Sequence, residues 1–223
     1  MRVSPPPCKA YVFDAYGTLF DFGAAVAQCP DIPDEKRTAL VTIWRDKQLQ
    51  YTWLRSLQKN HLDFEQVTAD ALDFALEATG LTDSARRQNL LALYQTLAAY
   101  PEVPAMLAAL KAKGVITAIL SNGTPAMLQA AINHSAITAL IDHVISVESV
   151  GIFKPAPEVY QLAVERLAVK PEEICFVSSN GWDAYSASAF GFQVIWCNRG
   201  GQPAERLAGQ PNFIFQNLAM IVN

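Results

Sequence analysis

The chain has 223 residues, which is enough to bury either one large core or a core with a smaller module. With 17 basic and 21 acidic residues its net charge is −4, which argues against a nucleic-acid-binding surface and favours a small-molecule ligand. No apolar run approaches the ~18 residues of a membrane span and no signal-peptide pattern opens the chain, so we expect a cytoplasmic protein without a membrane partner. The cysteines have neither disulfide nor metal spacing, which fits a reducing compartment, and they are Cys8, Cys29, Cys175 and Cys197.

The first clear element of the chain is a short buried strand. Residues 1–8 include three consecutive prolines and are expected to form a loose tail. In the stretch YVFDAYGTLFD at 11–21, the apolar run 11–13 does not alternate, which predicts a buried parallel strand. Asp14 then lies at the carboxyl end of this strand, where open α/β sheets bind their ligands, and Thr18 follows after a glycine turn. The alternative is that Asp14 only caps the next segment.

A long helical region follows this strand. Residues 22–33 show no clean period, whereas apolar spacing and stop signals predict helices over 34–58, 64–79 and 83–99. Because no strand is expected among them, we predict a helical cap domain over residues 22–99.

The predicted helix 34–58 carries two apolar stripes. The stripe expected to pack on neighbouring helices is formed by Leu40, Trp44, Tyr51 and Leu54. The nearly opposite stripe, which needs a second partner, is formed by Arg45, Leu49 and Trp53. We expect this second stripe to form a dimer contact or the roof of a pocket. The alternative for Arg45 is a solvated cation above a half-covered leucine. The aromatic residues Tyr51 and Trp53, together with Arg55, lead us to expect a homodimer.

From residue 100 onward the pattern alternates between helix and strand. Helices are predicted over 103–113, from Pro125, within 154–167 and over 183–190, and strands over 115–120, 143–147, 174–179 and, as the last one, 193–197. This alternation predicts an α/β fold with a doubly wound parallel sheet in a core domain of residues 9–21 and 100–223.

Polar side chains follow several of the predicted strands where each strand ends. They are Asp14 and Thr18, then Ser121 and Asn122, then Lys154, and finally Ser178, Ser179, Asn180 and Asp183. Any one of them fits a helix cap or a turn. Because the carboxyl ends of parallel strands meet at one edge of a sheet, we expect the four groups to converge in space.

These residues lie in motifs that resemble a known family. The motifs FDAYGTLFD, WRDKQLQYTWLRSL, ILSNGTPAML, FKPAPEVY and FVSSNGWDA resemble, in order and spacing, the L-2-haloacid dehalogenases of the haloacid dehalogenase superfamily. The resemblance implies a Rossmann-like core with a cap and cofactor-free, metal-free hydrolysis of short (S)-2-haloalkanoic acids to (R)-2-hydroxyalkanoic acids and halide. It further implies an aspartyl-ester intermediate and inversion at carbon.

The resemblance also implies the roles of the reacting residues. Asp14 is similar to the nucleophile of the family, and Asp183 is similar to the base that activates water against the ester. Lys154, Ser178 and Asn180 are expected to place both carboxylates. Thr18 and Tyr160 correspond to residues that orient Asp14 and Lys154, and the alternative for Tyr160 is a buried tyrosine with a satisfied hydroxyl.

Substrate and halide have separate expected partners. The side chain of Ser121 and the N–H of Ala15 are expected to hold the substrate carboxylate. The halide cradle implied by the resemblance consists of Arg45, Asn122 and Trp182. The wall around the alkyl group is expected from Tyr16, Leu49, Phe64 and Trp182. For Leu49, Phe64 and Trp182 the alternative is ordinary core packing.

Three other functions are open alternatives. The first is a Mg²⁺-dependent phosphatase, because phosphatases of the superfamily have a motif like DxDxT at the first strand. In this chain Tyr16 stands in place of the second aspartate of that motif, and Ser178, Ser179 and Asn180 replace a metal-binding triplet. The second alternative is a fluoroacetate-preferring enzyme with the same machinery. The third is a catalytically dead binding or dimerisation module.

The chain also departs from the family at Asp46, where a neutral glutamine is expected. We expect this carboxylate either to perturb Arg45 or to face solvent.

Overall fold

The computed structural model describes residues 8–27 and 32–222. Residues 1–7 of the expected tail and Cys29 lie outside this part of the chain. The strands are β1 (Ala10–Phe13), β2 (Ile116–Ser121), β3 (His143–Ser146), β4 (Ile174–Ser178), β5 (Gln193–Cys197) and β6 (Phe213–Phe215). The helices are α1 (Phe22–Ala27), α2 (Asp34–Gln58), α3 (Phe64–Thr79), α4 (Ser84–Ala92), α5 (Val103–Ala112), α6 (Pro125–His134), α7 (Pro157–Leu167) and α8 (Gly181–Phe190).

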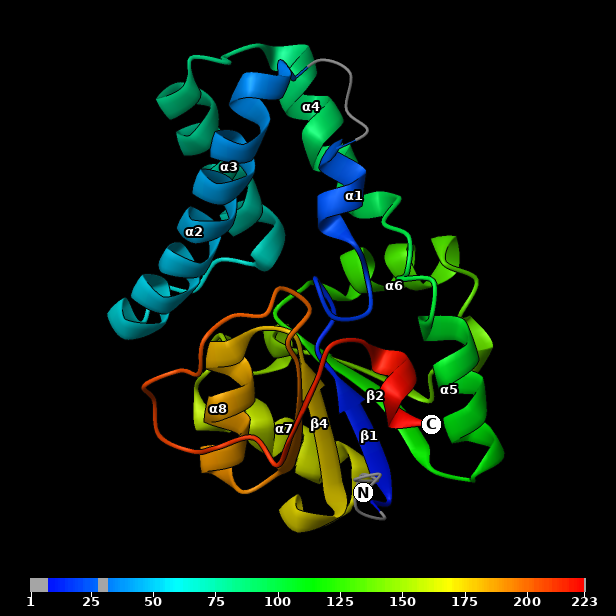
Figure 1. Cartoon of the computed structure of the whole chain (residues 1–223). Helices are drawn as coiled ribbons and strands as arrows, with labels where there is room; N and C mark the ends of the chain where they lie inside the picture. The colour runs from blue at the N-terminus through cyan, green and yellow to red at the C-terminus, as the bar shows by residue number, and fades with distance from the viewer. Residues whose placement is uncertain (1–7, 28–31, 223) are drawn as a thin grey trace.

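The strands form one parallel sheet in the order β3-β2-β1-β4-β5-β6. The first strand is central, because Val12 pairs with Ala118 of β2 on one side and with Phe176 of β4 on the other. The order reverses direction between β3 and β4, and α7 and α8 lie on the side of the sheet opposite α5 (Figure 1). The predicted doubly wound parallel sheet is therefore confirmed.

The helices between β1 and α5 stand beyond the edge at which the strands end (Figure 1). Their ends follow local chemistry: the Asp63 carboxylate accepts the N–H of Gln66 at the start of α3, and Gly80 ends α3 with a left-handed φ of 67°. Asp83 caps α4 in the same way as Asp63 caps α3. Within the described ranges, no helix has both the length and the apolar character that crossing a membrane requires.

The prediction of one helix over 83–99 is wrong. Helix α4 ends at Ala92 and a short 3₁₀ helix, η1, covers Leu93–Gln95. The tighter turn directs Tyr94 inward, where its ring meets Tyr16 edge-on at 5.3 Å, and the following chain runs back to pair Ala99 with Phe20 in an isolated bridge. Packing against the sheet domain thus overrides local helix propensity.

One of the predicted stripes on α2 also needs correction. Leu54 is 45% exposed, so it does not share the buried face. The buried residues recur instead at every fourth position and are Leu40, Trp44, Gln48 and Thr52. The buried stripe includes polar groups because hydrogen bonds satisfy them: Gln48 donates to Thr68 and Tyr94, and the hydroxyl of Thr52 donates to the carbonyl of Leu49.

Strand β5 is not the last strand, because β6 (Phe213–Phe215) pairs with it at the edge of the sheet. Only three residues long and with Ile214 exposed, β6 lacks the continuous apolar run that marks the inner strands. Residues 22–27, which lack a clean period, form the short helix α1.

Candidate active site

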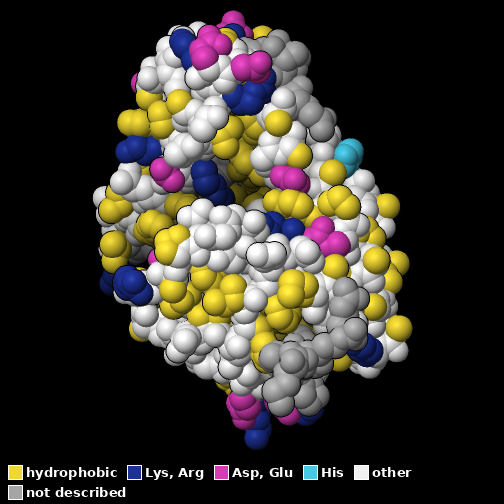
Figure 2. Space-filling view, viewed as in Figure 1, with side chains coloured by type: hydrophobic (Ala, Val, Ile, Leu, Met, Phe, Trp, Pro, Cys, Tyr) yellow, Lys and Arg dark blue, Asp and Glu magenta, His cyan; other side chains and the backbone are white. Residues whose placement is uncertain are grey.

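The sheet order brings the polar strand ends together. Strands β2, β1 and β4 are adjacent, so Ser121, Asp14 and Ser178 emerge next to one another. Lys154 arrives from the loop that precedes α7, and Asp183 lies in the first turn of α8. The space-filling view shows a hollow between the helical part and the sheet part of the molecule, with hydrophobic atoms inside and Lys and Arg side chains at its rim (Figure 2).

Asp14 accepts three side-chain hydrogen bonds. Its Oδ2 accepts from the Thr18 hydroxyl at 3.0 Å and from the Asn180 amide at 2.9 Å, and its Oδ1 accepts from Lys154 Nζ at 3.1 Å. The residue is 7% exposed. Donors fixed in this way set the orientation of the carboxylate and the direction of its lone pairs.

Lys154 is a buried cation between two carboxylates. Its Nζ donates to Asp14 Oδ1 at 3.1 Å and to Asp183 Oδ2 at 2.9 Å, and it lies 4.9 Å from the ring centre of Phe176. Burial alone lowers the pKa of Lys154, but the two carboxylates outweigh burial and raise the pKa above its ordinary value. The ammonium therefore stays charged in the site.

Asp183 is completely buried and has two fixed donors, Lys154 and the Tyr160 hydroxyl, which donates to Oδ1 at 2.8 Å. Burial raises the pKa of Asp183, although Lys154 lowers it, and the net shift is upward. Burial and the nearby carboxylate also raise the pKa of Tyr160 well above its ordinary value, so its hydroxyl stays protonated and donates. A carboxylate with a raised pKa is a stronger base at neutral pH.

A second layer of bonds fixes the turns that carry these groups. Thr18 Oγ1 accepts the N–H of Ser179 at 2.8 Å and lies 3.0 Å from the hydroxyl of Ser179. The hydroxyl of Ser178 accepts the N–H of Asn180 at 3.1 Å. Ser179 was predicted to lie at a strand end, from the triplet Ser178, Ser179 and Asn180, but its contact with Thr18 was not predicted.

Arg45 of α2 reaches the core from the helical part. Its Nη2 donates to Asn180 Oδ1 at 3.3 Å, and its Nη1 donates to Gln48 Oε1 at 2.7 Å. Asn180 therefore links Arg45 to Asp14, because its amide nitrogen binds the carboxylate. Gln48 was missed by sequence analysis, since a polar residue in a helical repeat gives no local sign that it is buried. Asp46 is exposed, which places its carboxylate on the solvent side of the helix.

The turn after β2 holds the expected anion-binding residues. The hydroxyl of Ser121 accepts the N–H of Gly123 at 3.1 Å, and Asn122 Oδ1 accepts the backbone N–H of Lys154 at 3.0 Å. This bond engages the oxygen of the Asn122 amide and uses neither of its N–H donors. After β1, the carbonyl of Ala15 accepts the N–H groups of Thr18, Leu19 and Phe20, which closes the turn beside Asp14.

Aromatic side chains form two groups next to these polar residues. Tyr16 stacks on Phe64 with ring centres 5.9 Å apart, and Trp182 meets Trp53 edge-on at 5.5 Å. Leu49 is half-buried on the same helix as Trp53. Within the described part of the chain, the buried hydroxyl of Tyr16 has no hydrogen-bond partner. Burial raises the pKa of Tyr16 well above its ordinary value, which keeps this hydroxyl protonated.

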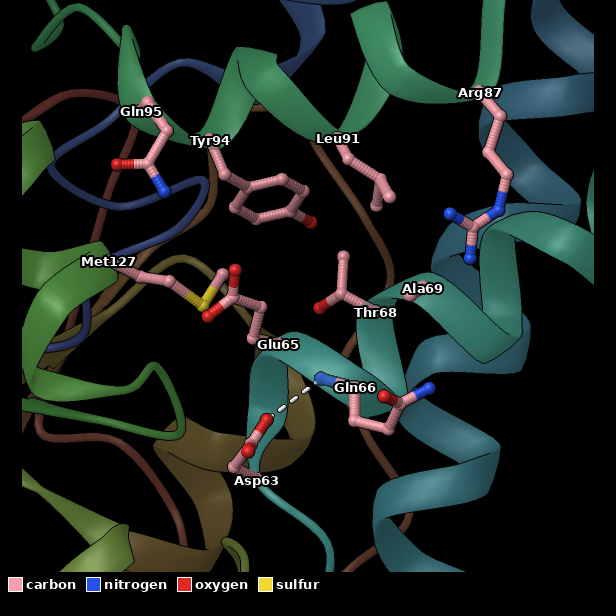
Figure 3. A pocket seen from close by; sticks show the side chains of 10 residues that line it. All are labelled: Asp63, Glu65, Gln66, Thr68, Ala69, Arg87, Leu91, Tyr94, Gln95 and Met127. Carbon is pink, nitrogen blue, oxygen red and sulfur yellow. Dashed lines mark hydrogen bonds between the residues drawn. The ribbon is translucent and has the colours of Figure 1, made fainter. Parts of the chain in front are cut away.

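A separate cleft of about 420 Å³ lies behind this aromatic group, between the start of α3, the end of α4 and α6 (Figure 3). Its lining includes Glu65, Tyr94 and Met127. The residues singled out from the sequence do not line it, but Tyr94 lines the cleft and its ring contacts the ring of Tyr16. Among residues 8–27 and 32–222, no group of three or more His, Cys, Asp or Glu side chains is arranged to hold a metal ion.

Comparisons with known proteins agree with the motifs. The model of the haloacid dehalogenase-like hydrolase family matches residues 8–191. The chain is 47% identical to (S)-2-haloacid dehalogenase 1 of Pseudomonas sp. strain CBS-3 over 89% of this chain and 88% of that protein. It is 44% identical to (S)-2-haloacid dehalogenase 4A of Burkholderia cepacia over 88% of this chain and 86% of the relative.

A solved structure shares the whole architecture. The L-2-haloacid dehalogenase of Xanthobacter autotrophicus, with chloropropionic acid covalently bound, superimposes with a TM-score of 0.85 at 36% identity, over 95% of this chain and 96% of the other. The similarity therefore covers both the helical part and the sheet part of the molecule.

Proposed function

Because the chain belongs to the haloacid dehalogenase-like hydrolases, we propose that it hydrolyses short (S)-2-haloalkanoic acids to (R)-2-hydroxyalkanoic acids and halide. The observation that carries this proposal is the Asp14 carboxylate at the end of β1, held by Lys154 and Asn180, with the Arg45 guanidinium on the far side of Asn180. Such a carboxylate is positioned for attack at carbon.

In the first step an oxygen of Asp14 attacks the α-carbon opposite the halogen. A C–O bond forms, the carbon–halogen bond breaks, and the halide leaves with the bonding electrons, so the carbon is inverted. The substrate is an anion, and two like charges ~4 Å apart repel by about 4 kcal/mol at an effective dielectric of 20. Lys154 and Arg45 offset this repulsion, and the turn with Ser121 and the N–H of Ala15 offers donors to the substrate carboxylate.

The departing halide needs donors that become available as charge develops on it. Arg45, Asn122 and Trp182 are proposed for this cradle. Support comes from the position of the Arg45 guanidinium beside Asn180 and from the amide of Asn122, whose oxygen is already engaged by Lys154 N. Tyr16, Leu49 and Phe64 are proposed as the wall around the alkyl group, since Tyr16 and Phe64 form a stacked apolar surface.

In the second step water attacks the carbonyl carbon of the Asp14 ester, and Asp183 takes one proton from this water. The bond between the carbonyl carbon and the ester oxygen breaks, and the leaving oxygen takes up the second proton of the water, so that the hydroxy acid leaves. Asp14 is regenerated as a carboxylate with one oxygen from water, and Asp183 releases its proton to solvent. The raised pKa of Asp183 favours this proton transfer, and Tyr160 and Lys154 hold the carboxylate in place. The net reaction consumes water and releases halide and one proton.

The side chains do not fit the Mg²⁺-dependent phosphatase alternative. Asp14 and Asp183 both bind Lys154 Nζ, so a cation that used both carboxylates would have to displace the buried ammonium. Tyr16 occupies the position at which the phosphatase motif has its second aspartate, and its ring stacks on Phe64. Mg²⁺ prefers several oxygen ligands in octahedral geometry, which this donor set does not offer.

Three further features belong to the same proposal. We propose that residues 22–99 form the cap domain and that residues 9–21 with 100–223 form the core. The position of α1–α4 beyond the strand ends supports this division (Figure 1).

We also propose that the protein is a homodimer. Apolar side chains on α2 that are exposed in the single chain support this proposal, with Leu57 80% exposed. It is cytoplasmic, supported by the thiols of Cys8, Cys175 and Cys197, which are buried and free.

The decisive experiment measures halide release from the separate enantiomers of 2-chloropropionate in EDTA, for the wild type and for Asp14→Asn. Release from the S enantiomer alone, absent in Asp14→Asn, supports the reaction and the nucleophile. Fluoride release from fluoroacetate in preference to chloride release from 2-chloropropionate would favour the defluorinating alternative. Metal-dependent turnover of phosphate esters without halide release would overturn the proposal.

A further inference from the structure

Glu148 joins the helical part to the core at the wall of the proposed pocket. It lies in the 3₁₀ helix η3 (Val147–Ser149), directly after β3. Its Oε1 accepts the backbone N–H of Phe64 at 3.0 Å, and its Oε2 lies 2.8 Å from His61 Nε2. The two partners are 84 and 87 residues away in sequence and both precede or begin α3.

The bond to Phe64 fixes a helix end. Phe64 is the first residue of α3, so its N–H has no partner within the helix and a carboxylate there is favoured by the helix dipole. Asp63 already caps the N–H of Gln66, and Glu148 satisfies the N–H of Phe64 from the opposite domain. The backbone that carries the Phe64 ring is therefore held by a core residue.

The other end of Glu148 leads to the turn after β2. Its N–H donates to the hydroxyl of Ser146 at 3.2 Å, and this hydroxyl donates to the carbonyl of Gly123 at 2.7 Å. Gly123 belongs to the turn that holds Ser121 and Asn122. A continuous set of bonds thus connects the proposed binding turn for the substrate carboxylate with the apolar wall.

The side of Glu148 away from Phe64 is also fixed. The ring of His61 packs against that of Phe153, with the ring centres 4.8 Å apart and the planes tilted by 38°, and Phe153 directly precedes Lys154. The side chains of His61 and Glu148 are 24% and 20% exposed, so water screens this contact less than it screens a surface ion pair.

We propose that Glu148 is a positioning residue that sets the accepted length of the substrate alkyl group, by fixing the distance between the turn after β2 and the Phe64 wall. This inference rests on the proposed function, because it assigns the alkyl group to the Phe64 side of the pocket. When Glu148 is removed, the start of α3 loses its core anchor and the wall recedes, so longer substrates gain relative to short ones.

The test compares chloride release from (S)-2-chloropropionate and (S)-2-chlorohexanoate for Glu148→Ala and Glu148→Gln. One methylene in an apolar pocket changes kcat/KM by roughly 10–200-fold, so we expect the ratio of the long to the short substrate to rise at least about threefold in Glu148→Ala. The change should appear mainly in KM. Glu148→Gln keeps a side-chain oxygen that can accept the N–H of Phe64, so its ratio of long to short substrate should equal that of the wild type.

Asp142→Ala is the matched control. Asp142 also accepts one backbone N–H, from Thr117 at 3.0 Å, and contacts one basic side chain, Lys111, but both partners belong to the core. A merely structural loss should act alike in the two alanine variants, whereas the substrate ratio should change in Glu148→Ala alone. An unchanged ratio in Glu148→Ala, or an equal change in Asp142→Ala, would overturn the inference.

Hydrogen exchange of the amides in 61–67 gives a readout that needs no turnover. Exchange at Phe64 should be faster in Glu148→Ala and unchanged in Glu148→Gln and Asp142→Ala. Unchanged exchange in Glu148→Ala overturns the anchoring role whatever the activity. A wild-type protein that releases no chloride overturns the proposed function and the role in substrate length, while the exchange result separately decides whether Glu148 holds Phe64.

Discussion

Replacing Lys154 by methionine tests the central charge arrangement of the site. The substitution keeps the length of the side chain but removes the ammonium that lies 3.1 Å from Asp14 Oδ1 and 2.9 Å from Asp183 Oδ2. Two buried carboxylates are then left without their shared cation. Breaking a buried ion pair in this way costs about 3–5 kcal/mol of unfolding free energy, so we expect a loss of that size at about pH 8.

The loss should depend on pH, and its sign follows from the pKa of Asp183. Burial already raises this pKa, and Lys154 opposes the rise, so the pKa rises further in Lys154→Met. A carboxyl group with a raised folded-state pKa contributes stability below its unfolded pKa, and that stability is lost as the pH rises through the folded pKa. The variant should therefore be closest to the wild type at low pH and furthest from it at high pH.

The size of the pH effect follows from the geometry. The two oxygens bound to Lys154 Nζ can be no more than about 6 Å apart, at which distance two negative charges repel by on the order of 3 kcal/mol at an effective dielectric of 20. Protonation of one carboxyl removes this repulsion. We expect the difference in unfolding free energy between wild type and variant to shrink by about 1–3 kcal/mol from about pH 8 to about pH 5.

Urea denaturation of both proteins at several pH values measures this difference. Lys111→Met is the control, because Lys111 binds the single carboxylate of Asp142 in a site about one-third exposed, and such pairs contribute about 0–1 kcal/mol. A stability difference for Lys154→Met that stays constant between about pH 5 and pH 8 would refute the coupling of Asp14 and Asp183 through Lys154.

Three further substitutions have defined outcomes. Tyr16→Phe removes a buried hydroxyl that has no partner in the described part of the chain, so urea denaturation should show an unfolding free energy higher by about 1–3 kcal/mol, and a decrease would show that the hydroxyl is satisfied. Tyr160→Phe removes the 2.8 Å donor to Asp183, so kcat should fall by about 10–100-fold, with the covalent ester accumulating in intact-protein mass spectra; a fall without ester would assign Tyr160 to the first step. Asp46→Gln changes an exposed carboxylate, so kcat/KM for (S)-2-chloropropionate should stay within about twofold of wild type, and a larger change would mean that Asp46 acts on Arg45.

The sheet and the polar strand ends were predictable because their signals are local. An unalternated apolar run followed by a carboxylate, as at Asp14, marks both a buried strand and its ligand-facing end. Proline at the start of α6 and glycine at the end of α3 fix helix boundaries through backbone geometry alone. For these elements local preference and tertiary packing agree, so residues near in sequence were sufficient.

The errors occur where tertiary contacts override local preference. Residues 93–99 have helical spacing, yet the chain leaves the helix so that Tyr94 can meet Tyr16. Leu54 has the right spacing for a buried stripe but is exposed, while Gln48 is buried because Thr68 and Tyr94 accept its amide protons. The partners of Gln48 are 20 and 46 residues away, so a single-sequence pattern carries no sign of them.

The contacts of Glu148 show why the shape of the pocket is harder to predict than its chemistry. The chemistry proposed for Asp14 and Lys154 needs particular residue types, and those types are visible in the sequence. The distance from Asp14 to the apolar wall depends instead on how the start of α3 is held, and a glutamate that follows β3 in sequence holds it. Glutamate is common on protein surfaces, so nothing in its residue type distinguishes an anchor from a solvated side chain. Substrate length is therefore set by residues whose role appears only once the two parts of the chain are packed together.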